Sequence, residues 1–257
     1  MKTFLLSLCL GLLPVVPLLA QTTPTSPTVP TPKTAVQWYN QGVDKLNSQD
    51  YAGAIADFSQ SIHLNPKDAD TFYNRGYAQH ILGNHTAAIA DYTQALQLNP
   101  KFAYAFGNRC YAFFLLKQYA RAIEDCTNAI VLNPHYADFY IYRGNAQDDI
   151  GQPKTALADF NDAIRLNPKH ANAYYNRGLT HNRLKESQKA LADYTKSIEL
   201  NPKLAEAYFN RGLTQALLKQ EKAAITDLKM AAQLFQAQGK TELAQKAEQL
   251  SQQLSQG

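Results

Sequence analysis

Charged side chains are sparse in this chain of 257 residues, and neither sign of charge dominates. Lys, Arg, Asp and Glu together make up 18% of the residues, and the formal net charge at pH 7 is +4. Like charges nowhere form a long block. We therefore do not expect a broad basic or acidic surface of the kind that binds nucleic acid.

The sequence also lacks the motifs that bring reactive or ligating groups together. Six histidines occur, but none stands in an H-E-x-x-H pattern, and the three cysteines form no C-x-x-C pair. The glycine-rich loops that bind phosphate and the G-x-S-x-G nucleophile motif are missing as well. We therefore predict that the protein is not an enzyme, and that it holds no metal and no cofactor.

Long apolar runs are confined to the first 20 residues. Lys2, an apolar stretch over 4–19 and the small residue Ala20 are typical of a signal peptide, predicted here over 1–20. This predicts export to the periplasm or another extracytoplasmic space, with no membrane-spanning segment in the mature chain. Because Pro14 and Pro17 interrupt the stretch, the alternative is an uncleaved segment that stays as an N-terminal anchor.

The next segment, residues 21–34, consists almost wholly of Thr, Ser and Pro. Four prolines within nine positions exclude a helix and favour an extended, solvated chain. At about 3.1 Å per residue such a chain reaches roughly 40 Å. We predict that it is a linker between the signal peptide and a folded domain.

The rest of the chain repeats itself every 34 residues. The pair Asn-Pro recurs at this interval, and the same period carries Arg-Gly near the start of most units and Ala-x-x-Asp near their middle. Self-similarity at a fixed period is typical of stacked repeats. The units run over 35–68, 69–102, 103–136, 137–170, 171–204 and 205–238.

Within one unit, the residue pattern predicts two helices. In 69–102, helix formers and aromatic residues fill Ala69 to Leu82, and the run 83–85 interrupts them. A second run from Ala87 to Leu98 has apolar residues on a single helical face. Asn99-Pro100 ends it, because proline disfavours the helical conformation in the preceding residue. Two such short helices cannot bury their apolar faces alone, so neighbouring units must stack.

These units resemble the tetratricopeptide repeat (TPR) family over 35–238, about four-fifths of the chain. Position 20 of each unit is Ala, and position 8 is Gly in all units but the third, which has Cys110. Small residues at both positions let two helices approach closely. The resemblance, which is to bacterial exported members, implies an all-α, right-handed superhelical solenoid of six helix hairpins. A C-terminal capping helix and tail over 239–257 complete it, since the apolar residues there follow one stripe.

In the TPR family the first helix of each unit lines a concave groove, and positions 2, 5, 6, 9, 12 and 13 face it. The resemblance thus places an asparagine ladder at position 6, beside Tyr and Phe, in a groove that binds protein or peptide. The alternative is solvated helix surface. The predicted peptide-binding residues are Asn40, Tyr73, Asn74, Tyr77, Tyr104, Asn108, Tyr111, Phe114, Tyr142, Asn176 and Asn210.

The expected function is therefore a scaffold that mediates protein–protein interaction or complex assembly. The lysines with which one TPR subtype clamps the carboxylate tail of chaperones are missing here, so that partner is not expected, and the partner's identity stays open. The alternative is a structural subunit of an envelope assembly that associates with itself.

Two pairings across each hairpin are also predicted. A hairpin that turns near position 15 or 16 brings position 7 close to position 23, and position 8 close to position 24. Arg at 7 and Asp at 23 are then expected to form an ion pair within units two to six, as with Arg143 and Asp159 in the fourth. The alternative is that these arginines bind acidic ligands. In the third unit Cys110 and Cys126 face each other, which predicts a disulfide in an oxidising compartment. The alternative is two buried free thiols.

Overall fold

The regular structure is entirely helical wherever it is described. A computed structural model describes residues 32–256, in which thirteen α-helices and no strand occur. The predicted signal peptide and residues 21–31 of the predicted linker lie outside the described residues. The helices divide into an N-terminal unit that ends at Pro134 and a C-terminal unit that starts at His135.

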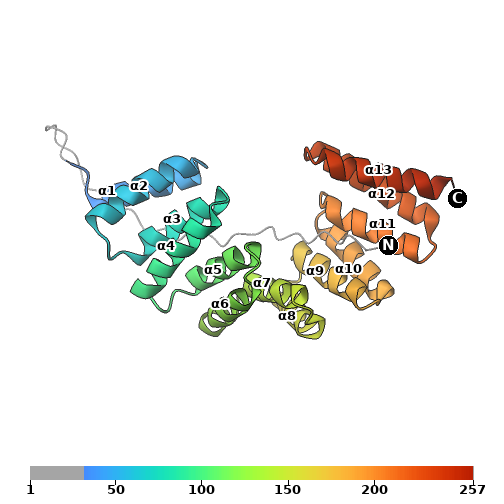
Figure 1. Ribbon diagram of the computed structural model, residues 1–257, viewed down its shortest axis with the longest axis horizontal. Coiled ribbons are helices and arrows are strands. Elements are labelled where there is room, and N and C mark those ends of the chain that lie inside the picture. The colour runs from blue at the N-terminus through green and yellow to red at the C-terminus, as the bar shows by residue number, and fades with distance from the viewer. Residues whose placement is uncertain (1–31, 257) are drawn as a thin grey trace. The chain divides into compact units, whose positions relative to one another are not determined.

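In the N-terminal unit, six helices pack as three consecutive hairpins, and each hairpin packs on the next (Figure 1). The helices are α1 (Ala35–Asn47), α2 (Tyr51–Leu64), α3 (Ala69–Ile81), α4 (His85–Leu98), α5 (Ala103–Leu115) and α6 (Tyr119–Leu132). Thr34 begins α1 with a capping box, in which its hydroxyl accepts from the Gln37 N–H and the Gln37 side chain accepts from the Thr34 N–H.

The C-terminal unit repeats the arrangement three times and adds one helix. Its helices are α7 (Ala137–Asp149), α8 (Pro153–Leu166), α9 (Ala171–Arg183), α10 (Ser187–Leu200), α11 (Ala205–Leu217), α12 (Glu221–Ala237) and α13 (Thr241–Ser255). The sixth repeat has Gln236 where earlier repeats have proline, and α12 accordingly continues to Ala237. Helix α13 packs on α12 through Ala244 and Ala247, with Leu243, Leu250 and Leu254 half-buried.

Each Asn-Pro pair ends the second helix of a repeat. The asparagine before the proline has an extended backbone, with φ of −137° at Asn65 and −133° at Asn99. In the turns at Asn65, Asn99, Asn167 and Asn201, the asparagine Oδ1 also accepts a hydrogen bond from the N–H two residues on. This local Asx turn explains why the pair recurs at each helix end.

In each repeat the residue at position 15, two residues after the end of the first helix, has a left-handed backbone. Gly83 and Gly151 occupy this place with φ of 80° and 79°. The other repeats place side chains there, at Gln49, Lys117, Lys185 and Lys219. Because Gly83 reverses the chain by itself and Asn84 already serves as the N-cap, α4 begins at His85 rather than at Ala87 as predicted.

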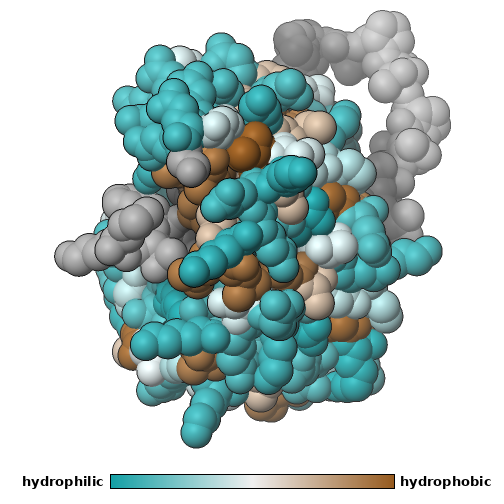
Figure 2. Space-filling model, turned by 90° about the vertical axis from the view of Figure 1, so that its right-hand side faces the viewer, coloured by the Kyte–Doolittle hydropathy of each residue, from teal (hydrophilic) through white to brown (hydrophobic). Residues whose placement is uncertain are grey.

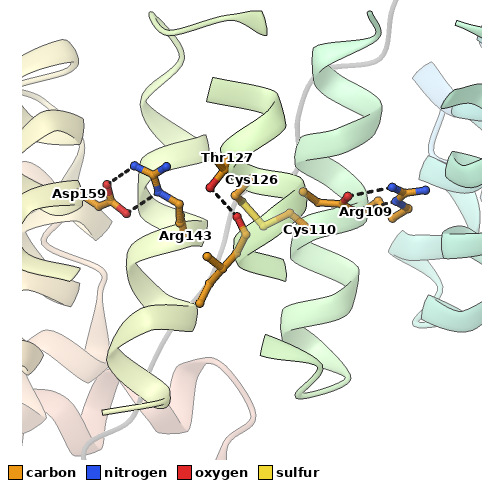
Figure 3. Close-up of a disulfide and its surroundings, with 8 residues drawn as sticks. Arg109, Cys110, Cys126, Thr127, Arg143 and Asp159 are labelled. Carbon is orange, nitrogen blue, oxygen red and sulfur yellow. Dashed lines mark hydrogen bonds and ion pairs between the residues drawn. A yellow bond between two sulfur atoms is a disulfide. The ribbon is translucent and has the colours of Figure 1, made fainter. Parts of the chain in front are cut away.

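The seam between the two helices of a hairpin is filled by position 8 against position 24. A Cβ atom added to Gly178 would lie 2.7 Å from the Tyr194 ring carbon Cε1, and one on Gly144 would lie 2.8 Å from Phe160. In the third repeat Cys110 and Cys126 form the predicted disulfide, with their Cα atoms 5.4 Å apart (Figure 3). A covalent link therefore replaces the contact between glycine and a large side chain.

The predicted Arg–Asp pairs are confirmed in all five repeats that carry them. The guanidinium donates through two nitrogens to both carboxylate oxygens, at 2.8 and 2.7 Å for Arg143 and Asp159 (Figure 3). The aspartates are buried, and burial raises the pKa of the Asp159 carboxyl while Arg143 opposes that shift. A third nitrogen of Arg75 donates to Ser59 of the preceding repeat. These arginines thus link neighbouring repeats as well as the two helices of their own repeat.

Candidate functional site

The asparagines at position 6 are buried rather than exposed, which corrects the prediction that they line an open groove. Asn74, Asn108 and Asn210 have no exposed surface, and Asn176 is 2% exposed. Only Asn40, in the first repeat, is half-buried. An amide that solvent does not reach cannot pair with the backbone of an incoming peptide unless the surrounding side chains move.

A tyrosine at position 5 of the preceding repeat explains this burial. The Asn74 amide donates to the Tyr39 hydroxyl at 2.9 Å, and Asn108 donates to Tyr73 at 3.0 Å. Asn210 donates to Tyr175 at 2.8 Å in the same way. These hydrogen bonds join successive repeats within each unit. The asparagine ladder is therefore an element of the stacking, and Tyr73 is part of it.

Asn176 departs from this pattern. Position 5 of the preceding repeat is Ile141, which has no hydroxyl group, and neither polar atom of the Asn176 amide has a hydrogen-bond partner among the described residues. Tyr142, which occupies position 6 of the preceding repeat, is 2% exposed. Neither residue offers a surface to a ligand.

The predicted aromatic residues of the N-terminal unit are brought together, but they pack on one another. Tyr111 and Phe114 stack with an interplanar angle of 11°, Tyr111 stacks on His80, and Phe114 contacts Tyr119. Burial lowers the pKa of His80 to about 3. Tyr77 and Tyr104 are half-buried and stay the most accessible aromatic members of the predicted set in this unit.

The C-terminal unit instead contains an open pocket of about 1090 Å³ between α9, α11 and α13. This volume lies slightly above the usual range of ligand sites, which ends at about 1,000 Å³. Figure 2, which views the side of the molecule where these helices lie, shows hydrophobic side chains in furrows between hydrophilic ridges. The lining residues are Asn182, Arg183, Lys185, Ser187, Leu213, Thr214, Ala216, Leu217, Leu228, Leu250, Gln253 and Leu254.

Leucines dominate this pocket, and one of them is unusually exposed. Leu217 exposes 70% of its surface, although it stands beside partly buried leucines from α11 and α13. Leu213, Ala216 and Leu217 occupy positions 9, 12 and 13 of the sixth repeat. The TPR register places these three positions in the groove. Leu213, Ala216 and Leu217 are nevertheless not among the peptide-binding residues predicted from the sequence.

A polar network forms the side of the pocket that α9 contributes. The Asn182 amide donates to the Thr214 hydroxyl at 2.7 Å and to the Tyr194 hydroxyl at 3.1 Å. Arg183 lies 3.2 Å from Asp148 and 3.1 Å from Asp149. The Asn182 bonds hold α9 against α10 and α11, and the Arg183 ion pairs hold α9 against α7. The wall is therefore fixed, and the pocket exists before any ligand binds.

A second hollow, of about 750 Å³, lies between α12 and α13 and is shallower. Glutamines and alanines line most of it, including Gln233, Gln236 and Gln249. Long, flexible amides that water already solvates offer little free energy to an apolar ligand. The pocket between α9, α11 and α13 is therefore the stronger candidate site.

The described residues give no indication of metal chemistry or of a bilayer-spanning helix. Between residues 32 and 256, no group of three or more His, Cys, Asp or Glu side chains could hold a metal ion. No helix in the same range is both long and apolar enough to cross a membrane.

The chain is similar to solved helical-repeat structures. It matches a chain of the APC/C hetero-tetramer Cut9–Hcn1 with a TM-score of 0.74 and 20% identity, over 85% of this chain but only 42% of that one. It matches MamA from Desulfovibrio magneticus RS-1 with a TM-score of 0.61 and 21% identity, over 66% and 96%. YrrB, described as a TPR protein with an unusual peptide-binding site, matches with a TM-score of 0.55 and 24% identity. The match covers 75% of this chain and 97% of the YrrB chain.

The sequence itself matches models of one family along most of its length, whereas no curated protein matches it. Models described as tetratricopeptide repeat or TPR repeat match residues 46–83, 69–102, 103–136, 137–170, 171–204 and 193–226. With helix hairpins at the same places, and with a small residue facing a larger side chain across the seam, the chain belongs to the tetratricopeptide repeat family.

Proposed function

We propose that this protein is a non-catalytic scaffold that holds another protein through a short peptide segment, bound in the pocket between α9, α11 and α13. The observation that carries the proposal is Leu217, a large apolar side chain that is 70% exposed at the edge of a preformed leucine-lined pocket. Apolar surface gathered in a concave site is typical of ligand binding. YrrB, with its peptide-binding site, supports a peptide as the ligand.

A leucine-sized side chain from a partner would gain about 1.5 to 3 kcal/mol on full burial in such a pocket. The pocket walls are already fixed by the Asn182 and Arg183 hydrogen bonds. A preformed site loses little conformational entropy when it binds, so this gain is largely retained in the affinity. Weak to moderate affinity for short segments, strengthened by additional contacts in a whole partner, is the expected behaviour.

The test is a phage-display selection of random peptides on the purified protein. Selected peptides should lose at least about tenfold in affinity for Leu217→Asp, because one anchor burial is removed and a charge is placed in its site. Val131→Asp is the matched control, since Val131 is 76% exposed and lies outside the pocket. If no selected peptide distinguishes the two variants, the proposed function is wrong.

We also propose that the protein is exported, with residues 1–20 as a signal peptide and the alternative of a retained anchor. The basic start and apolar stretch support export, and the disulfide between Cys110 and Cys126 is of the kind that persists in oxidising compartments. Cell fractionation followed by N-terminal sequencing tests this. A chain that begins at Gln21 supports cleavage, a membrane-bound chain that retains Lys2 supports the anchor, and a cytoplasmic chain contradicts export.

A further inference from the structure

The charged side chains that line the leucine pocket are all cationic. Arg183 and Lys185 take part in the lining, and no Asp or Glu does. Arg183 is already compensated, because its guanidinium pairs with Asp148 and Asp149. Lys185, exposed in the turn after α9, forms no ion pair with any residue in the described range 32–256. The rim therefore offers one uncompensated positive charge beside an apolar surface.

The apolar part of the lining comes from helices that differ from those that supply the cations. Leu213 and Leu217 lie on α11, Leu250 and Leu254 lie on α13, and Lys185 lies between α9 and α10. A ligand that uses the whole pocket must therefore present apolar groups to α11 and α13 and a different chemistry to the α9–α10 turn. A basic group there would be repelled by Lys185, whereas a carboxylate would be attracted.

We propose that the pocket recognises a protein segment that combines leucine-like side chains with an acidic residue. The apolar side chains lie against α11 and α13, and the carboxylate lies near Lys185. This inference rests on the proposed function and names the class of its ligand. The capping helix α13 is then half of a binding site in addition to covering the end of the repeats.

Lys219 provides a control that the chain itself supplies. It occupies position 15 of the next repeat, it is exposed, and its left-handed φ of 60° closely matches the 62° of Lys185. It does not line the pocket. A charge reversal at Lys219 therefore changes the net charge and the local backbone strain in the same way as one at Lys185, without touching the site.

The probes are three fluorescein-labelled peptides with the same leucines and a pair of Glu, Gln or Lys residues at the same places. Fluorescence anisotropy should show the Glu peptide binding about fivefold more tightly than the Gln peptide, in line with one exposed ion pair, with a smaller ratio at high salt. Lys185→Glu should invert the order, so that the Lys peptide binds most tightly. Lys219→Glu should leave the order unchanged.

Equal affinities for the Glu and Gln peptides would overturn the inference, as would an inversion caused equally by Lys219→Glu. The inference also fails if none of the three peptides binds while peptides from the phage selection do. Leu217→Asp separates this failure from that of the proposed function. If Leu217→Asp weakens all three peptides but charge has no effect, the leucine pocket binds peptides and only the acidic preference is wrong. If Leu217→Asp changes nothing, both proposals fall.

Discussion

The N-terminal and C-terminal units share their hairpin seam but differ on the face that their first helices form. In the N-terminal unit, positions 9 and 12 of the third repeat are Tyr111 and Phe114, whose rings stack on each other, and Tyr111 also stacks on His80. In the C-terminal unit the corresponding residues of the sixth repeat are Leu213 and Ala216, which line a pocket. Aromatic rings that pack on one another fill this face of the N-terminal unit, whereas the smaller side chains of the C-terminal unit leave a pocket.

This difference indicates that a contiguous aromatic face is not by itself a binding site. Aromatic residues bury large areas and favour contact with each other, so a set of them on adjacent helices tends to collapse. Leucine and alanine at the same register are too short to fill that space. The frame common to both units therefore sets where a site can be, and the side-chain volume at positions 9, 12 and 13 decides whether it is open.

The largest loss of stability is expected when a side chain is added at position 8, in the hairpin seam that both units share. Gly178→Val should destabilise the protein by about 3 kcal/mol, because a Cβ at that place meets the fully buried Tyr194 ring at 2.7 Å. Ala192→Val, on the exposed surface of α10, is the control and should cost well under 1 kcal/mol. Urea unfolding followed by circular dichroism measures both. Equal midpoints would show that the seam can expand.

The disulfide allows the third repeat to be compared with the others at the same contact. Reduction should lower the free energy of unfolding by about 2 to 3 kcal/mol, as expected for a short closed loop. The double variant Cys110→Gly/Cys126→Tyr installs the contact of the second repeat, where Gly76 faces Tyr92. It should fold and should not respond to reductant. A wild-type protein that unfolds identically with and without reductant would contradict the prediction.

Much of this fold follows from spacing alone, and the Arg–Asp and Cys–Cys pairs show why. Both rest on short-range hairpin geometry: the two residues are 16 apart in sequence and the turn lies midway. Contacts of this kind depend on few other residues. The Asn-Pro pair is likewise local, because its effect on the backbone reaches only the next turn.

The site was harder to predict, because burial depends on what the neighbouring repeat presents. The repeat register predicts that position 6 faces the groove, yet the Tyr39 hydroxyl, from 35 residues upstream, covers Asn74. A signal for this existed in the pairing of Tyr at position 5 with Asn at position 6 of the following repeat, which recurs within both units. Leucine is equally common in buried cores, so Leu213 and Leu217 at groove positions do not by themselves indicate a pocket in the sequence.

A change of pH should affect the closed face of the N-terminal unit through His80. Its folded-state pKa is about 3 while that of an unfolded histidine is near 6.5. The unfolded chain therefore binds a proton that the folded chain does not, and stability is lost as the pH falls below 6.5. At pH 5 the loss from this group is about 2 kcal/mol.

The measurement compares wild type with His80→Gln at pH 7 and pH 5 in urea. All other titratable groups, including the neighbouring His85, are common to both proteins, so their contribution cancels in the difference. His63→Gln, at an exposed position of α2, is the control and should follow the wild type. If wild type and His80→Gln lose the same stability between the two pH values, His80 is protonated in the folded protein.

The smallest expected effects concern position 15, where the units differ in how they complete the same turn. Lys117 in the N-terminal unit has a left-handed φ of 59°. Gly151 in the C-terminal unit has a φ of 79°, and a Cβ atom added to it would lie in open space. A side chain costs about 1 kcal/mol in this conformation, partly offset because glycine has more freedom when unfolded. Lys117→Gly should therefore stabilise the protein by about 0.5 kcal/mol, and Gly151→Lys should destabilise it by a similar amount. Thermal unfolding of the two variants measures these shifts against wild type. Shifts of the same sign would mean that the backbone at one of these turns differs from the one described.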